Sequence, residues 1–163
     1  MTKSRDTADI NSGTNTAVGE DALENNAASN NTAVGYQAMT ANTTGTESVG
    51  IGNRALASQT TGRNTAVGFN AGQDISTGTS NTMLGQEAGE NTTTGGTNVA
   101  VGTQALRANT TASNNTAVGS QSLYATTSLL YPSDAAAETP SIDLGRRRNL
   151  KNKHKTTPKN YPP

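Results

Sequence analysis

A five-residue unit with the pattern Asn-Thr-Ala-Val-Gly recurs along most of this chain and constrains its fold more than any other feature. Seven copies close on Gly19, Gly35, Gly52, Gly68, Gly85, Gly102 and Gly119, so that successive closing glycines lie 16 or 17 residues apart. The third residue after each glycine is Ala, or Ser in the last copy, and a polar turn such as residues 42–45 follows. A repeat this regular decides the architecture before any other argument.

The length of the period indicates which kind of repeat this is. Helical hairpin repeats need more than about 30 residues, whereas 16–17 residues suffice for two short strands and two turns. The Thr-Ala-Val core alternates and favours β-structure, and Gly and Asn supply the positive φ angles of tight corners. We therefore predict an all-β fold, a parallel β-solenoid or β-roll of seven repeats in which successive coils stack at about 4.8 Å.

The composition agrees with a narrow, repetitive fold. Of the 163 residues only 31% are hydrophobic and 3% aromatic, which is little material for a globular core. Such low hydrophobicity also occurs in disordered chains, but those tend to carry a high net charge, and here the net charge is zero. The chain has no Cys, which excludes disulfides and thiolate metal sites. Stability should therefore come from stacking and from association.

Two columns of apolar residues run through the repeats. We predict that the solenoid core is the aliphatic column, which consists of Val18, Val34, Ile51, Val67, Leu84, Val101 and Val118. Alternation along a strand places the preceding residue on the opposite face. That column is Ala17, Ala33, Gly50, Ala66, Met83, Ala100 and Ala117, and its small apolar residues predict close packing against other copies of the chain. We therefore expect an oligomer interface there, in a closed cyclic assembly.

Further columns complete the repeat. The second residue after each glycine is always polar and should face water, as Arg54 and Glu87 illustrate. The Asn residue that opens most repeats should form side-chain ladders that satisfy backbone groups at the corner. Tyr36 and Phe69 share the column directly after the glycine, where packing at the edge of the roll is preferred over a ligand platform.

Composition changes on both sides of the repeats. We divide the chain into an N-terminal extension (1–12), the β-roll repeat domain (13–131) and a C-terminal arm (132–163) that contains all five prolines. The arm has seven basic and three acidic residues, a net charge of +4, and its basic residues are Arg146, Arg147, Arg148, Lys151, Lys153, Lys155 and Lys159. We predict that it is extended and docks on a partner protein. Nucleic acid is the weaker alternative, because no aromatic stacking platform accompanies the charges.

Signs of catalysis are lacking in the sequence. His154 is the only histidine and lies in the basic arm, away from any Ser, Cys or Asp constellation. The acidic residues are scattered over polar positions, and Gly95-Gly96 is not followed by the Lys-Ser/Thr of a phosphate loop. We expect no enzymatic activity, no cofactor and no metal. No stretch approaches the roughly 20 apolar residues that span a bilayer, so membrane insertion is not expected either.

The repeats resemble two groups of known proteins. Ser48 to Gly52 (Ser-Val-Gly-Ile-Gly) and Asn98 to Gly102 (Asn-Val-Ala-Val-Gly) resemble the Ser-Val-Ala-Ile-Gly repeats of trimeric autotransporter adhesin heads. The form Asn-Thr-Ala-Val-Gly-x-x-Ala-Leu is similar to repeats of bacteriophage tail fibres and other virion appendages. The resemblance covers about residues 13–125, and it implies a left-handed roll and a homotrimer. The present period exceeds the usual autotransporter repeat by two or three residues, so the turns must bulge.

The resemblance directs the expected function. We expect a virion structural protein, a trimeric fibre, spike or head decoration at the virion surface that binds other virion proteins and contacts a host surface glycan or protein. The start of the chain lacks the apolar run of a secretory signal, which favours this role over a bacterial surface adhesin. A fragment of a bacterial adhesin head is the alternative. An ice-binding solenoid is a remote one, because Val49 and Val99 interrupt the Thr column.

Overall fold

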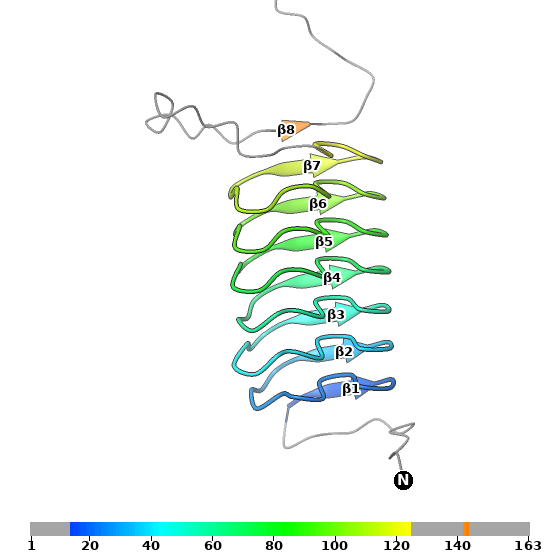
Figure 1. The fold of residues 1–163 in the computed structure, drawn as a ribbon, viewed down its shortest axis with the longest axis vertical. Helices are drawn as coiled ribbons and strands as arrows, with labels where there is room; N and C mark the ends of the chain where they lie inside the picture. Colours follow the sequence, from blue (N-terminus) through cyan, green and yellow to red (C-terminus); the bar gives the residue numbers. More distant parts are fainter. Residues whose placement is uncertain (1–13, 125–141, 144–163) are drawn as a thin grey trace, which may run out of the picture.

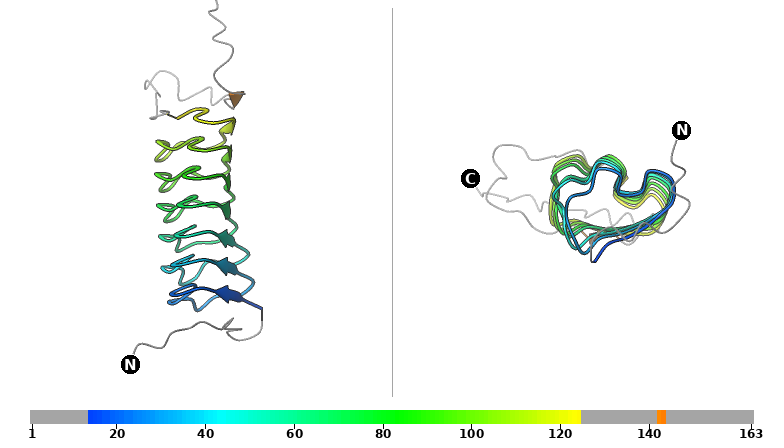
Figure 2. Two further views of the ribbon diagram at one scale, coloured as in Figure 1. Left: turned by 90° about the vertical axis from the view of Figure 1, so that its right-hand side faces the viewer. Right: turned by 90° about the horizontal axis from the view of Figure 1, so that it is seen from below.

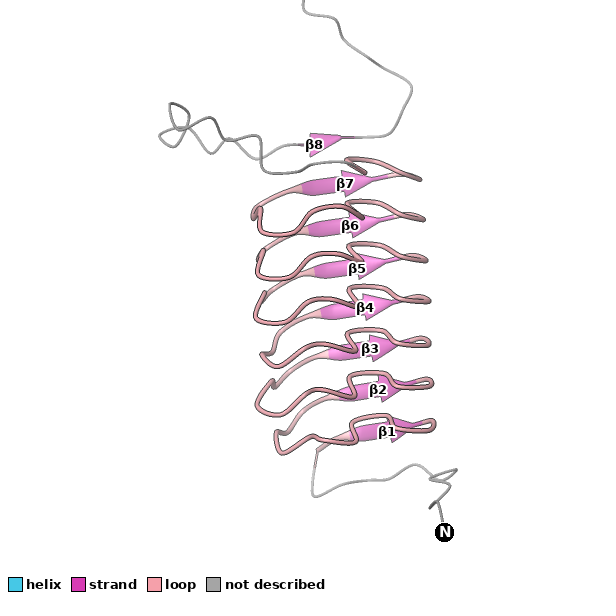
Figure 3. Cartoon of the chain, viewed as in Figure 1, coloured by secondary structure: helices cyan, strands magenta, loops and turns pink. Residues whose placement is uncertain are grey.

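The repeats fold into one continuous parallel sheet. The computed structural model describes residues 14–124 and 142–143, and these residues form strands and turns without a helix. The strands are β1 (Thr16–Val18), β2 (Thr32–Val34), β3 (Val49–Ile51), β4 (Thr65–Val67), β5 (Thr82–Leu84), β6 (Val99–Val101), β7 (Thr116–Val118) and β8 (Ile142–Asp143). They pair in sequence order to give an eight-stranded sheet (Figures 1 and 3). The predicted β-solenoid is therefore confirmed.

Each repeat makes one coil and returns to the same register. Thr16 pairs with Thr32, Ala17 with Ala33 and Val18 with Val34, and the same pairing continues through β7. Seen along the stack, the coils superpose on one narrow outline (Figure 2). Because the register never shifts, equivalent residues of all repeats form straight columns on the surface and in the core.

The glycine that closes each strand is required by the turn that follows. Gly85, for example, has a φ of 134°, and a Cβ atom on it would lie 2.6 Å from the carbonyl oxygen of Gly102 on the next coil. The chain then passes through two left-handed residues, such as Glu87 and Gly89 with φ of 55° and 59°. In most other coils these two positions carry ordinary side chains, at a cost of about 1–2 kcal/mol each. Hydrogen bonds between coils, such as that from the Glu87 N–H to the Phe69 carbonyl (2.8 Å), hold this returning side in place.

The structure reverses the predicted inside and outside of the strands, and both predictions are wrong. The aliphatic column predicted as the core lies on the outer face: Val18, Ile51, Leu84 and Val118 are 38–47% exposed, and Val34, Val67 and Val101 are half-buried. The small column predicted as the oligomer interface lies inside the coil: Ala17, Ala33, Gly50, Ala66, Met83, Ala100 and Ala117 are all buried.

The width of the coil explains this reversal. Alternation separates two neighbours onto opposite faces, but it does not state which face is inside. The returning side of each coil contributes its own alanine and a larger residue to the interior, as Ala105 and Leu106 do, and both are fully buried. The strand opposite can then add only a small side chain without overpacking the core. The core is therefore built from alanines on both sides and one Leu or Met column between them.

Asparagine ladders line one corner of the coil, as predicted. Asn31 accepts a hydrogen bond from the Ser48 N–H of the next coil (3.1 Å) and donates one to the Gly45 carbonyl (2.8 Å). Asn81 repeats the arrangement with the Asn98 N–H (2.9 Å) and the Gly95 carbonyl (2.9 Å). Buried amides are stable only when both of their ends are hydrogen-bonded, and the regular stacking provides both partners.

One short strand lies in the segment predicted as an arm. β8 pairs in parallel with β7, with Thr116 opposite Ile142 and Ala117 opposite Asp143. The range 132–163 therefore contributes an eighth strand to the sheet at the C-terminal end of the solenoid (Figure 1). The seven basic residues of the proposed docking arm and His154 lie outside the described residues, as does the N-terminal extension.

Candidate interaction surfaces

The outer face of the sheet presents an aliphatic residue to its surroundings on every coil. Two columns point outward from the strands, the aliphatic column and the column two residues before it. The latter consists of Thr16, Thr32, Val49, Thr65, Thr82, Val99 and Thr116. We call these fourteen residues the Thr-Val face, and none of them is charged. The face extends over seven strands, or roughly 30 Å at the usual strand spacing.

The Thr-Val face has the composition of a protein contact and not of a solvated surface. A strand that faces water on one side alternates apolar with polar residues, and here the outer residue before each turn is Val, Ile or Leu in every coil. Monomeric proteins rarely expose a contiguous apolar strip of this kind. The sequence analysis identified both columns, but it placed the aliphatic column inside the coil and did not join the Thr column to it as one face. Alternation itself could have joined the two columns, because residues two apart share a face.

A small charged cluster lies on the returning side of the coil, near the C-terminal end of the stack. Arg107 Nε is 2.6 Å from a carboxylate oxygen of Glu90 and 3.1 Å from one of Glu87. Arg107 also donates to the Tyr124 hydroxyl (2.9 Å), and Gln104 donates to Glu87 (2.8 Å). These contacts engage Nε and Nη1 of the guanidinium, and they tie three neighbouring coils together.

Titration of these groups follows from their neighbours. The hydrogen bond from Gln104 lowers the pKa of Glu87, with Gln86 and Arg107 adding to the effect against desolvation. Partial burial raises the pKa of Asp74, and the charge of Glu90 raises it further. The shift of Glu87 thus reflects hydrogen bonding and its ion pair, and that of Asp74 reflects burial and a neighbouring carboxylate.

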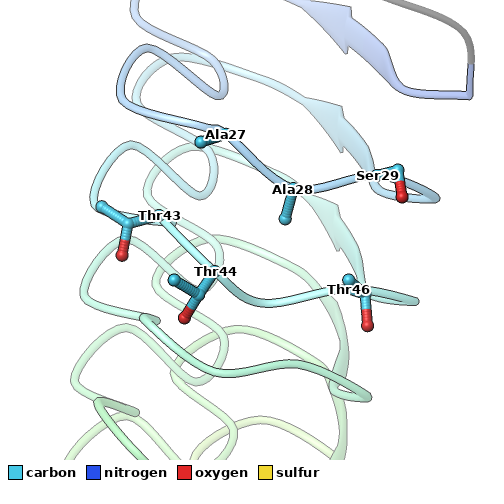
Figure 4. A pocket seen from close by; sticks show the side chains of 6 residues that line it. All are labelled: Ala27, Ala28, Ser29, Thr43, Thr44 and Thr46. Atoms are coloured by element: carbon cyan, nitrogen blue, oxygen red, sulfur yellow. The ribbon is translucent and has the colours of Figure 1, made fainter.

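A shallow hollow is found between the first two coils (Figure 4). It is lined by Ala27, Ala28, Ser29, Thr43, Thr44 and Thr46. The lining offers methyl groups and hydroxyls but no titratable side chain, so the hollow lacks the groups that acid–base or metal chemistry requires. Among the described residues no group of three or more His, Cys, Asp or Glu side chains could hold a metal ion.

No helix among the described residues is long and apolar enough to cross a membrane. Comparison with protein-family models, with curated proteins and with solved structures finds no match to this chain.

Proposed function

We propose that the chain is a non-enzymatic structural protein, a homotrimeric fibre, spike or decoration of a virus particle. The observation that carries the proposal is the Thr-Val face, an uncharged and largely aliphatic surface on the outside of a rigid rod. The likeness of the repeats to those of virion appendages supports the virion location. Small residues fill the interior of the coil, and what they contribute is stability along the rod. Such an interior suits a mechanical role.

The three rods pack through the Thr-Val face in this proposal. The interface predicted on the Ala column is not available, because those residues are buried within each coil. Interface centres are depleted in charge and rich in apolar side chains, as this face is. Since every coil presents the same two outer columns, the contact can continue along the whole stack and close around one axis.

The mass of the purified protein in solution tests the assembly. Light scattering should give three times the chain mass of 16.6 kDa. Leu84 is the most exposed member of the aliphatic column, and Leu84→Lys should shift the mass toward one chain because three ammonium groups would meet near the axis. Thr94→Lys, on an exposed turn outside the face, is the matched control and should stay trimeric. A wild-type protein of single-chain mass would refute the assembly.

The virion location has a separate test. Protein mass spectrometry of purified virus particles should detect the chain in a fixed ratio to the other particle proteins, in multiples of three copies. A chain found only in the host cell fraction would contradict the location but leave the trimer intact.

One structural observation favours a second candidate function, an ice-binding solenoid. Five of the seven residues in the outer column that precedes the aliphatic one are Thr, and they lie in register on a continuous sheet. Regularly spaced hydroxyl and methyl groups on a flat face can order water. The two candidates differ in what covers the face: a thermal hysteresis assay on a single-chain protein would support ice binding, and a trimer without hysteresis would exclude it.

A further inference from the structure

Two aromatic side chains stand on the surface in the column directly after the turn glycine. Tyr36 is 43% exposed and Phe69 is 49% exposed, so the predicted packing at the edge of the roll does not account for either ring. Tyr124, which is 38% exposed, is engaged by Arg107, whose guanidinium lies 5.9 Å from the ring centroid. Neither Tyr36 nor Phe69 belongs to the buried core, and each leaves close to half of its surface open to solvent.

The backbone fixes the spacing of these two positions along the rod. The Arg54 N–H donates to the Tyr36 carbonyl (2.9 Å), and the Asn70 N–H donates to the Asn53 carbonyl (2.9 Å). Asn53 holds the same position in the coil between the two aromatic residues. Tyr36 and Phe69 are therefore two coils apart, about 9.6 Å along the rod, at twice the usual strand spacing.

Polar side chains border the aromatic residues at the same turn. Asn53 and Arg54 are exposed, and Arg54 donates to Gln37 (3.3 Å). The strip therefore alternates an aromatic ring, an amide and an aromatic ring, and hydrogen-bonding groups lie beside it. We call Tyr36, Asn53 and Phe69 the aromatic ladder.

We propose that the aromatic ladder binds an extended, neutral polysaccharide that runs parallel to the rod. One face of a pyranose ring presents C–H groups that pack on an aromatic ring, while the hydroxyls at its edge bind amides and guanidinium groups. In an extended β-linked chain every second sugar has the same orientation, which suits two rings separated by one polar residue. A strip one residue wide also suits a linear polymer better than a protein, whose stable contacts need about 800 Å² on each partner.

This inference rests on the proposed function only for the source of the polysaccharide, which would be a surface that the virus particle meets. Isothermal titration with cellohexaose, a linear β-1,4-linked glucan oligosaccharide, is the first measurement. We expect a dissociation constant near or below about 1 mM for the wild type. Tyr36→Ala and Phe69→Ala should each weaken binding about tenfold through loss of one stacking contact, and the double variant should show no binding.

Matched variants make the measurement specific. Tyr124→Ala removes an aromatic ring of similar exposure elsewhere on the coil and should bind as the wild type does. Phe69→Tyr keeps the ring and should retain affinity. Maltohexaose, an α-linked chain that curves, should bind markedly more weakly than cellohexaose.

The proposed trimer and the proposed sugar site are tested by separate measurements. Light scattering on the same samples reports the assembly, whereas titration reports the ligand. The inference is overturned if cellohexaose does not bind the wild type at millimolar concentration, or if the double variant binds as well as the wild type. It is also overturned if the double variant dissociates the trimer, because the rings would then belong to the contact between chains.

Discussion

Met83 carries the largest side chain of the inner strand column, and its neighbours are shaped around it. The other members of that column are Ala or Gly, and the position that is Leu or Met in most coils is Gly72 and Gly89 on either side of β5. A Cβ on Gly89 would lie 2.6 Å from Met83 Cε, and one on Gly72 would lie 2.9 Å from Ile75 Cδ1. The departures from the repeat therefore compensate one another within a single packed layer.

A second exchange of the same kind occurs two coils earlier. Met39 replaces the usual Leu, and Gly50 replaces the usual Ala of the strand that follows. A Cβ on Gly50 would lie 2.8 Å from Met39 Cγ. Volume added on one side of the narrow interior is thus removed from the other, which is the behaviour expected of a core with no room to expand.

Substituting Gly89 and Met83 together should restore the stability that each substitution alone removes. Gly89→Leu should destabilise the protein by about 1–3 kcal/mol through overpacking, and Met83→Ala by about 2–5 kcal/mol through a cavity. The double variant recreates the Leu-Ala pair of the other coils, and Leu56 shows that Leu tolerates this left-handed position with a φ of 53°. Its unfolding free energy, from chemical denaturation, should lie close to that of the wild type.

A double-mutant cycle shows which result would contradict this prediction. If the two changes act independently, their unfolding free energies will add, and the double variant will be the least stable of the four proteins. Strong coupling with restored stability is what the packing around Met83 requires.

At the scale of the elements, the sequence predicts the coil well but not its orientation. The period, the alternation and the turn glycines together specify a parallel solenoid, and the structure confirms it along with the asparagine ladders. The face that is buried could not be read from the strand alone, because Ala66 and Val67 are both apolar. It depends on the returning side of the coil, where left-handed residues aim Ala71 and its equivalents inward.

The left-handed turn after each strand decides which face of the strand is buried. Strict alternation fails there, so the sequence alone does not assign the Leu or Met residue four positions after each glycine to a face. The structure places this Leu column in the core, with Leu56 and Leu106 fully buried. Once that column is inside, the interior has no space for a second large one. The candidate surface follows from the same step, since the aliphatic column must then face outward.

The same substitution at two neighbouring positions of β4 should affect folding in one case and assembly in the other. Ala66→Arg places a guanidinium inside the coil without a partner and should abolish cooperative folding or lower the melting temperature strongly. Val67→Arg places the same group on the outer face, so the fold should persist while the assembly dissociates. Circular dichroism melting and light scattering on both variants measure the two effects separately.

The opposite result would support the faces predicted from the sequence, with the aliphatic column inside the coil. A folded Ala66→Arg protein that loses only its assembly, beside an unfolded Val67→Arg protein, would place the Ala column at the interface.

At the scale of the whole molecule, the described residues form a straight stack whose C-terminal end is continued by β8 (Figures 1 and 2). Repeat proteins need terminal segments that differ from the repeats, because the last coil otherwise leaves backbone groups unpaired and a sheet edge open. β8 supplies such a segment on β7 with only two residues. The range 132–163 thus combines a pairing strand with the basic residues that we propose as the docking arm.

Graded truncation separates these two roles. Removing residues 146–163 deletes all seven basic residues of the arm but keeps β8, whereas removing residues 132–163 deletes both. Both proteins should remain trimers of the same β-structure by light scattering and circular dichroism, because the Thr-Val face is intact in each. Both should fail to incorporate into virus particles, because the charged segment that would contact the partner protein is absent. A shorter truncation that incorporates normally beside a longer one that does not would assign docking to residues 132–145 instead. Normal incorporation of both would place the anchor elsewhere, with residues 1–12 as the next segment to delete.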